Sequence, residues 1–174
     1  VSSITYFNSI RFIPSKYRPN LGIILDPNLF GIFVISAVLK EIDMRALVTG
    51  GALRLGREMA LYLAGQGYDV AVHFARSEQE AQSTVLAILE MGQNAVALQA
   101  DLLDEDQTSS LIKRAVDGLG GRLDILVNNA SIFEHDTIKS ATRQSWDRHI
   151  ESNLRAPFVL TQEFAKQAPK ARDD

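Results

Sequence analysis

From residue 44 onward, short apolar runs alternate with segments in which apolar residues recur every three or four positions. The runs occupy residues 45–49, 69–75, 94–100 and 123–128. Runs of this length are typical of buried strands, and the spacing in the segments between them is typical of amphipathic helices. Strands that alternate with helices form a parallel sheet with helices on both faces and right-handed crossovers. The sequence therefore predicts an α/β fold.

The same alternation predicts a doubly wound, Rossmann-like sheet. Its strand order should begin 3-2-1-4, with a ligand at the carboxyl ends of strands one and four, where the order reverses. Ser77 and Glu80 predict a capping box at the second helix, and Asp104 should open the third. A long helical region runs from about residue 142 towards 168, with a candidate kink at Pro157. The residues expected to face the core are Leu55, Met59 and Leu63 in the first helix, Ala81, Val85, Ile88 and Leu89 in the second, and Leu111, Ala115 and Leu119 in the third.

Composition excludes several classes of protein. Apolar residues make up 46% of the chain, which excludes a disordered polymer. The 18 basic residues are balanced by 21 acidic ones, so no excess positive charge is available to bind nucleic acid. Cysteine is absent, which excludes disulfides and thiolate metal sites and fits a reducing compartment, so we expect a cytoplasmic protein. The three histidines lack metal-ligand spacing, and we expect no metal site.

Residues 1–43 lack the alternating pattern. Their apolar run at 29–39 is shorter than the roughly 20 residues of a membrane span, so no membrane association is expected. The run also ends without the small-residue cleavage site of a secretory signal. Met44 stands directly before the first strand, and we expect it to be the natural start, with residues 1–43 upstream sequence that is read through. A genuine appended segment, such as a transit peptide, is the alternative.

A glycine-containing loop, T-G-G-A-L-R-L-G at 49–56, joins the first strand to the first helix. Glycines let a backbone turn tightly and approach a phosphate, and the helix N-terminus supplies free N–H groups. The dinucleotide fingerprint G-x-G-x-x-G is not met literally. A plain connecting turn is the alternative, but the strand–loop–helix context favours a phosphate loop.

This loop resembles that of the short-chain dehydrogenase/reductase superfamily, usually T-G-x-x-x-G-x-G, with Arg54 in place of the middle glycine as in the pteridine reductase branch. The stretch H-F-A-R-S at 73–77 is similar to the H-Y-x-R-S of that branch. N-N-A-S at 128–131 is similar to the superfamily's N-N-A-G, with the branch's serine, and Phe133 follows it. Asn153 in S-N-L-R-A-P-F matches the region of the active-site asparagine. The resemblance covers residues 44 to about 168.

The resemblance implies a site for NADP(H). The second strand ends without the acidic residue that holds a ribose 2′-hydroxyl in NAD enzymes, and Arg76 can accommodate a 2′-phosphate. Purely structural roles are the alternatives to cofactor binding: Arg76 as a solvated surface charge, Ser77 as a helix cap and Asp101 as a turn residue. The predicted cofactor-binding residues are Gly50, Arg54, Leu55, Gly56, His73, Arg76, Ser77, Asp101, Leu102, Asn128, Ala130 and Ser131. We interpret His135 and His149 as surface residues.

On the substrate side, the resemblance implies that Phe133, Arg54 and Ser131 contact a flat pterin ring, which an aromatic face can stack upon. A core position for Phe133 is the alternative. Trp146 and the Leu160/Phe164 pair should be core or subunit contacts, and the full-length form should be a homo-oligomer.

The superfamily's proton-donating Tyr-x-x-x-Lys pair is missing. The four tyrosines are followed at the fourth position by isoleucine, leucine, glutamine and valine, which leaves Asn153 as the one predicted catalytic residue. We therefore expect a fragment, truncated before the later strands and inactive alone, of an NADPH-dependent oxidoreductase that reduces dihydropterin or dihydrofolate. The alternatives are a short-chain carbonyl or 3-oxoacyl reductase, or a non-catalytic nucleotide-binding module.

Overall fold

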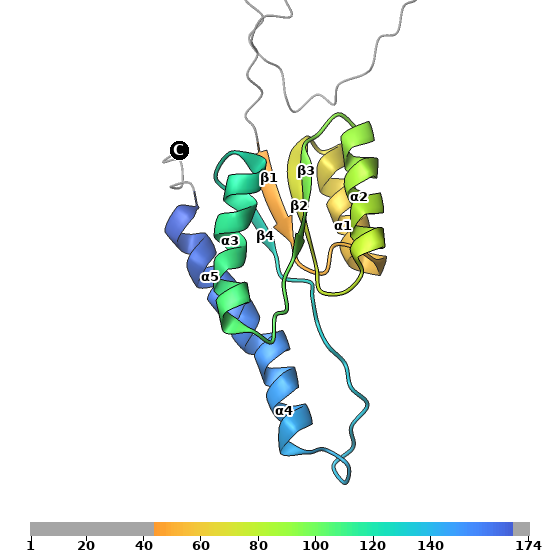
Figure 1. Ribbon diagram of the computed structural model, residues 1–174, viewed down its shortest axis with the longest axis vertical. Helices are drawn as coiled ribbons and strands as arrows, with labels where there is room; N and C mark the ends of the chain where they lie inside the picture. Colours follow the sequence, from red (N-terminus) through yellow and green to blue (C-terminus); the bar gives the residue numbers. More distant parts are fainter. Residues whose placement is uncertain (1–43, 169–174) are drawn as a thin grey trace, which may run out of the picture. The chain divides into compact units, whose positions relative to one another are not determined.

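A computed structural model describes residues 44–168, which form a parallel four-stranded sheet of order β3-β2-β1-β4 (Figure 1). The predicted strand order is confirmed. The ends of the strands differ from those of the apolar runs by one or two residues, because a strand begins and ends where its hydrogen bonds to the neighbouring strand do. They span Met44–Val48 (β1), Tyr68–Phe74 (β2), Ala95–Gln99 (β3) and Ile125–Val127 (β4). The interpretation of residues 1–43 lies outside the described residues.

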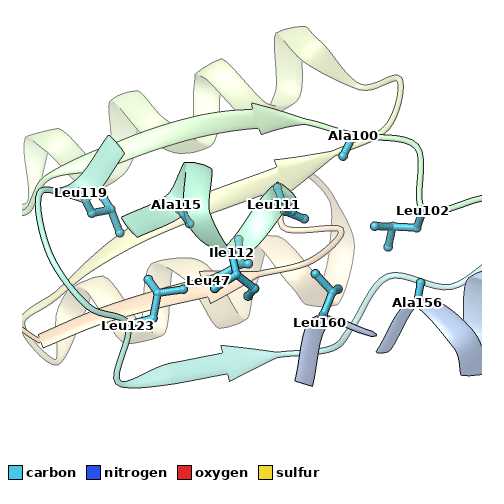
Figure 2. Packing of buried hydrophobic residues seen from close by; sticks show 11 residues of the cluster. Leu47, Ala100, Leu102, Leu111, Ile112, Ala115, Leu119, Leu123, Ala156 and Leu160 are labelled. Carbon is cyan, nitrogen blue, oxygen red and sulfur yellow. The ribbon is translucent and has the colours of Figure 1, made fainter. Parts of the chain in front are cut away.

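Two helical layers cover the sheet (Figure 1). Helices α1 (Arg54–Gly65) and α2 (Glu78–Glu90) lie on one face, and α3 (Glu105–Leu119) and α5 (Ala156–Gln167) lie on the other. Neighbouring strand residues point to opposite faces. Leu47 therefore packs in the cluster of α3 and α5 (Figure 2), whereas Val48 packs in the cluster of α1 and α2. This doubly wound arrangement matches the predicted fold class.

The long helical region is one continuous run with an irregular centre. It begins at Thr142, which caps α4 (Arg143–Ile150), continues through a π-helical turn, η1 (Glu151–Arg155), and ends with α5. Pro157, in the first turn of α5, has no N–H to donate to a carbonyl four residues back. Where a kink was predicted at Pro157, the structure has a π-turn that ends two residues before it, at Arg155.

Which residues the helices bury differs in part from the prediction. In α1 the fully buried residues are Gly56, Ala60 and Ala64, while Leu55 is 63% exposed. Met59 and Leu63 are partly buried against the same cluster, as predicted, whereas the prediction for Leu55 was wrong; the fully buried positions are small residues one step along, which let the helix approach the sheet closely. In α2, Leu89 is exposed and Thr84 is buried instead. The buried stripe predicted for α3 is confirmed.

The two predicted helix caps have different outcomes. Ser77 is the N-cap of α2, but its side chain makes no capping hydrogen bond, so the predicted capping box is wrong. Asp104 caps α3 as predicted, because its carboxylate accepts from the backbone N–H of Gln107 at 3.1 Å. The same bond lowers the pKa of Asp104. Among residues 44–168, no helix is long and apolar enough to cross a membrane.

Candidate cofactor site

The loop after β1 turns sharply and needs its glycines. Gly50 has a φ of +63°, in the left-handed region, and a Cβ there would lie 3.1 Å from Cα of Ala130. A Cβ on Gly56 would overlap the carbonyl oxygen of Gly50. Arg54 also has a positive φ, of 51°, which is costly for a residue with a side chain. These close approaches bring the start of α1 against the loop.

Thr49 ties this loop to the end of β4. Its buried Oγ1 accepts from the backbone N–H groups of Asn129 (2.9 Å) and Ala130 (3.0 Å) and donates to the carbonyl of Val127. In return, Nδ2 of Asn129 donates to the carbonyl oxygens of Thr49 (2.9 Å) and Gly50 (3.3 Å). The ends of β1 and β4 therefore form one hydrogen-bonded unit at the point where the strand order reverses.

Two further buried side chains hold the loop from the β2 side. The N–H of Gly50 donates to Nδ1 of His73 at 3.1 Å, and Nε2 of His73 lies 3.1 Å from the carbonyl oxygen of Ala100. Burial lowers the pKa of His73, so the ring is neutral at pH 7. The hydroxyl of Thr84 on α2 lies 3.3 Å from the carbonyl oxygen of Ala52 and shares its one proton with the carbonyl oxygen of Glu80, at 2.9 Å. The role of Thr84 could not be found from sequence, because nothing local distinguishes it from other helical threonines.

A cavity of about 580 Å³ opens at the carboxyl ends of β1, β2 and β3. Four of the predicted cofactor residues line it: Gly50, Arg76, Ser77 and Asp101. Asp101 also accepts from the N–H of Leu103, so the predicted alternative of a turn aspartate is correct alongside its place in the cavity. The other residues that line the cavity, which the sequence did not single out, are Ala52, Leu53, Phe74, Ala75, Gln99, Leu103, Ile132 and Arg148.

The remaining predicted residues do not line the cavity. His73 and Leu102 are buried, and Gly56 and Ala130 pack under the loop. The side chain of Leu55 lines a separate apolar groove beside Met59 and Val127. Asn128 donates to Oγ1 of Thr161 at 3.4 Å. Arg54 and Ser131 are exposed, so their roles toward a ligand stay predictions.

The segment after β4 carries the predicted substrate residue. Phe133 is 85% exposed, so the alternative of a core phenylalanine is wrong. The residue before it, Ile132, is held by the side-chain amide of Asn153 in η1. Oδ1 of Asn153 accepts from the N–H of Ile132, and Nδ2 donates to its carbonyl oxygen, each at 2.9 Å. The N–H of Glu134 donates to Nε2 of His149 at 3.0 Å. The predicted surface histidine therefore has a structural role, which no sequence signal indicated.

The arrangement fits an extended ligand that carries phosphates. Leu53, the N-cap of α1, provides no side-chain cap, so N–H groups of the first turn remain available to an anion. Arg76 adds a cation on the β2 side, and no acidic residue follows β2 before Glu78. In contrast, Tyr68 is the first residue of β2 and lies at the opposite edge of the sheet, away from the groups that would bind the phosphates. The described residues therefore provide binding groups but no tyrosine at the cavity.

Comparison with known proteins places the chain in a family. The model of the short chain dehydrogenase family matches residues 44–173. The 3-oxoacyl-[acyl-carrier-protein] reductase FabG of Staphylococcus aureus is 39% identical over 127 residues, which cover 73% of this chain and 51% of that protein. Trihydroxynaphthalene reductase PfmaI of Pestalotiopsis fici is 38% identical over 121 residues, covering 70% of this chain and 43% of that protein.

Solved structures agree with this placement. A short chain dehydrogenase from Burkholderia cenocepacia in complex with NADP has a TM-score of 0.70 and 38% identity, covering 72% of this chain and 51% of that one. FolM alternative dihydrofolate reductase 1 from Brucella suis in complex with NADP has a TM-score of 0.67 and 37% identity, with coverages of 75% and 53%. The chain thus spans about half the length of its relatives. The chain has a parallel sheet and a glycine loop that is hydrogen-bonded to the end of β4, and the family model matches residues 44–173. This chain therefore belongs to the short-chain dehydrogenase family of oxidoreductases.

Proposed function

We propose that this chain supplies the cofactor-binding half of an NADP(H)-dependent reductase. The observation that carries the proposal is the cavity lined by Gly50, Arg76 and Ser77, where β2 is followed by a cation and a hydroxyl and not by an acidic residue. An arginine forms strong, potentially bidentate hydrogen bonds to a phosphate. The solved relatives with NADP support the same choice of cofactor.

Each part of the cavity would have its own role. The first turn of α1 and the turn at Gly50 would bind the pyrophosphate. Arg76 and Ser77 would bind the 2′-phosphate, and Asp101 would contact the adenosine. NADPH, when bound, supplies the hydride. Asn153 would keep Ile132 in place at the edge of the cavity, through the two backbone bonds described above. Proton donation would come from a Tyr-x-x-x-Lys segment of the complete enzyme, so this chain alone should bind cofactor without turnover.

Arg76→Ala tests the cofactor assignment. Removing a hydrogen bond to a charged group costs about 1.5–3 kcal/mol, so NADP⁺ affinity should fall about tenfold to a hundredfold while NAD⁺ affinity changes little. Lys113→Ala, which removes an exposed α3 lysine paired with Asp117, is the matched control and should change neither affinity. Calorimetric titration of the full chain measures all of these values. Equal losses of NADP⁺ and NAD⁺ affinity in Arg76→Ala would contradict the assignment.

For the substrate, we propose a pterin- or folate-like ring. Phe133 is 85% exposed and free to stack on a flat heterocycle, with Arg54 and Ser131 as further candidate contacts. The similarity to FolM alternative dihydrofolate reductase 1 supports this class. In a complete enzyme containing this chain, Phe133→Leu should lower kcat/KM for dihydropterin about twofold to tenfold, because stacking beyond burial contributes about 0.5–1.5 kcal/mol. The KM for NADPH should stay unchanged, and Ile138→Leu, a second exposed position of the same segment, is the control.

A 3-oxoacyl reductase is the second candidate. The 39% identity to FabG of Staphylococcus aureus favours it. The same complete enzyme, assayed with dihydropterin, dihydrofolate and a 3-oxoacyl thioester, separates the two: turnover of the thioester alone would contradict the pterin proposal. NADP⁺ binding without turnover of any substrate would favour the remaining alternative, a nucleotide-binding module.

The long helix suggests how the complete protein would assemble. Trp146, Ile150, Leu154 and Phe158 recur every four residues along α4, η1 and α5, and each is at least 39% exposed. Burying such a stripe against a second copy would remove apolar surface from water. We therefore propose a homo-oligomer formed through this helix. Trp146→Lys should shift the sedimentation coefficient of the complete enzyme towards that of the monomer, and an unchanged coefficient would contradict the proposal.

A further inference from the structure

One buried imidazole joins three strand ends beneath the candidate cofactor cavity. His73 lies on β2 and is 1% exposed, with Nδ1 3.1 Å from the nitrogen of Gly50 and Nε2 3.1 Å from the carbonyl oxygen of Ala100. A backbone N–H can only donate and a carbonyl can only accept. Nδ1 must therefore be the unprotonated acceptor, and Nε2 must carry the proton. The two contacts assign one tautomer of the neutral ring.

We propose that neutral His73 is a positioning residue for the cofactor: it holds the Gly50 turn in the shape that receives the nucleotide phosphates, and its protonation releases that turn. This inference rests on the proposed binding of NADP(H). A second proton on the ring can only go to Nδ1, where it would face the N–H of Gly50. The hydrogen bond at 3.1 Å would then be replaced by two opposed donors. Gly50 lines the cavity, so the loss would act directly on the ligand.

The surroundings of His73 set the pH range of this effect. Burial lowers the pKa of His73, and the positive charge of Arg114 on α3 lowers it further, while the bond to Ala100 and the charge of Asp101 raise it. Residues 49–53 of the loop contribute no ionisable side chain. Since the pKa lies below the ordinary histidine value of about 6.5, the neutral ring that holds the loop should predominate above that pH. Cofactor affinity should then fall as the pH drops through the pKa of folded His73.

Two substitutions separate the Gly50 contact from the bulk of the ring. His73→Asn places an oxygen acceptor near the position of Nδ1 and cannot be protonated, whereas His73→Leu fills similar space without an acceptor. At pH 7.5 the asparagine variant should bind NADP⁺ within about threefold of the unsubstituted chain. The leucine variant should bind about threefold to tenfold more weakly, the effect of one neutral hydrogen bond.

Acidification gives the sharper comparison. As the pH is lowered from 7.5 through the pKa of folded His73, the unsubstituted chain should lose about threefold to tenfold more affinity for NADP⁺ than His73→Asn. The asparagine variant is the matched control, because the 2′-phosphate itself titrates near pH 6 and does so equally in both titrations. Calorimetric titration of the full chain measures these affinities. Identical pH profiles, or a leucine variant that binds as well as the asparagine variant at pH 7.5, would overturn the proposal.

A second measurement decides the proposal without any cofactor. Nitrogen-15 spectra of the imidazole report its tautomer, and hydrogen exchange reports whether the Gly50 amide is bonded. An Nε2–H tautomer at pH 7, with a protection factor for the Gly50 amide, relative to its intrinsic exchange rate at each pH, that falls on acidification, supports the proposal. A charged ring or a protonated Nδ1 at pH 7 overturns it. If no variant binds NADP⁺, the proposed function of the chain fails, and the spectra still decide the role of His73.

Discussion

The loop after β1 and the segment after β4 leave the same edge of the sheet and are held in different ways. The first is fastened by four buried or half-buried side chains, those of Thr49, His73, Thr84 and Asn129. The second is held by α4 and η1 only near its beginning, around residues 132 and 134, and it exposes Phe133 and Ile138. One loop is therefore part of the core, and the other projects from it.

This difference fits the two tasks that we propose for the loops. A loop that binds the same nucleotide phosphates in every catalytic cycle gains from being preorganised, because less ordering entropy is lost on binding. A segment that contacts substrate has no such constant partner and can vary without disturbing the sheet. Substitutions in the first loop should therefore change the free energy of unfolding of the full chain, and substitutions in the second should not.

Gly56→Ala should have the largest effect. The new Cβ would overlap the carbonyl oxygen of Gly50 and lie 2.5 Å from Nδ2 of Asn129, and neither group can move without breaking the pinned loop. We expect a loss of about 3 kcal/mol in the free energy of unfolding, measured by urea denaturation. Gly65→Ala is the control at the other end of α1, where nothing lies within 4 Å, and it should be neutral or stabilising.

Thr49→Val should come next. Valine keeps the shape of threonine but leaves the N–H groups of Asn129 and Ala130 without their acceptor. The N–H of Asn129 keeps a second acceptor, the carbonyl oxygen of Val127 at 3.1 Å, so the loss falls mainly on Ala130 and should lower the free energy of unfolding by about 1–2 kcal/mol. Thr108→Val is the control, because Thr108 is equally buried and its hydroxyl bonds only the carbonyl of Asp104 in its own helix. Equal losses in the two variants would mean that the tie to β4 contributes nothing.

How much of the fold and of the candidate site could be predicted depends on how far apart in the sequence the interacting residues lie. The strands and their order follow from apolar runs of local sequence, and Gly50, Arg76 and Ser77 follow from their places at strand ends. Arg148 was not predictable, because it reaches the cavity only after the chain has crossed from β4 to α4. The fully buried positions of α1 lie one residue from those predicted, since periodicity ranks leucine above the glycine and alanines that allow a close approach.

Arg54→Gly should stabilise the chain, whereas Gly56→Ala and Thr49→Val should destabilise it. An arginine at a φ of 51° costs about 1 kcal/mol that glycine does not incur, so the free energy of unfolding should rise by about that amount. If Arg54 contacts the cofactor as proposed, NADP⁺ affinity should fall at the same time. Leu53→Gly is the control: its φ is −139°, where glycine relieves no strain, so the free energy of unfolding should fall. A destabilised Arg54→Gly would show that the left-handed turn carries no strain.

The smallest effect is expected in the segment after β4, where Ile138 is 100% exposed. Ile138→Val removes one methylene from a side chain that is already in water, so the free energy of unfolding should change by less than about 0.5 kcal/mol. The identical change at Ile112, which is 2% exposed in the α3 cluster, should cost about 0.5–1.5 kcal/mol through lost burial and a small cavity. Urea denaturation of both variants compares one chemical change in two surroundings. A loss at Ile138 as large as that at Ile112 would mean that this segment is covered in solution, and the contrast between the two loops would then be wrong.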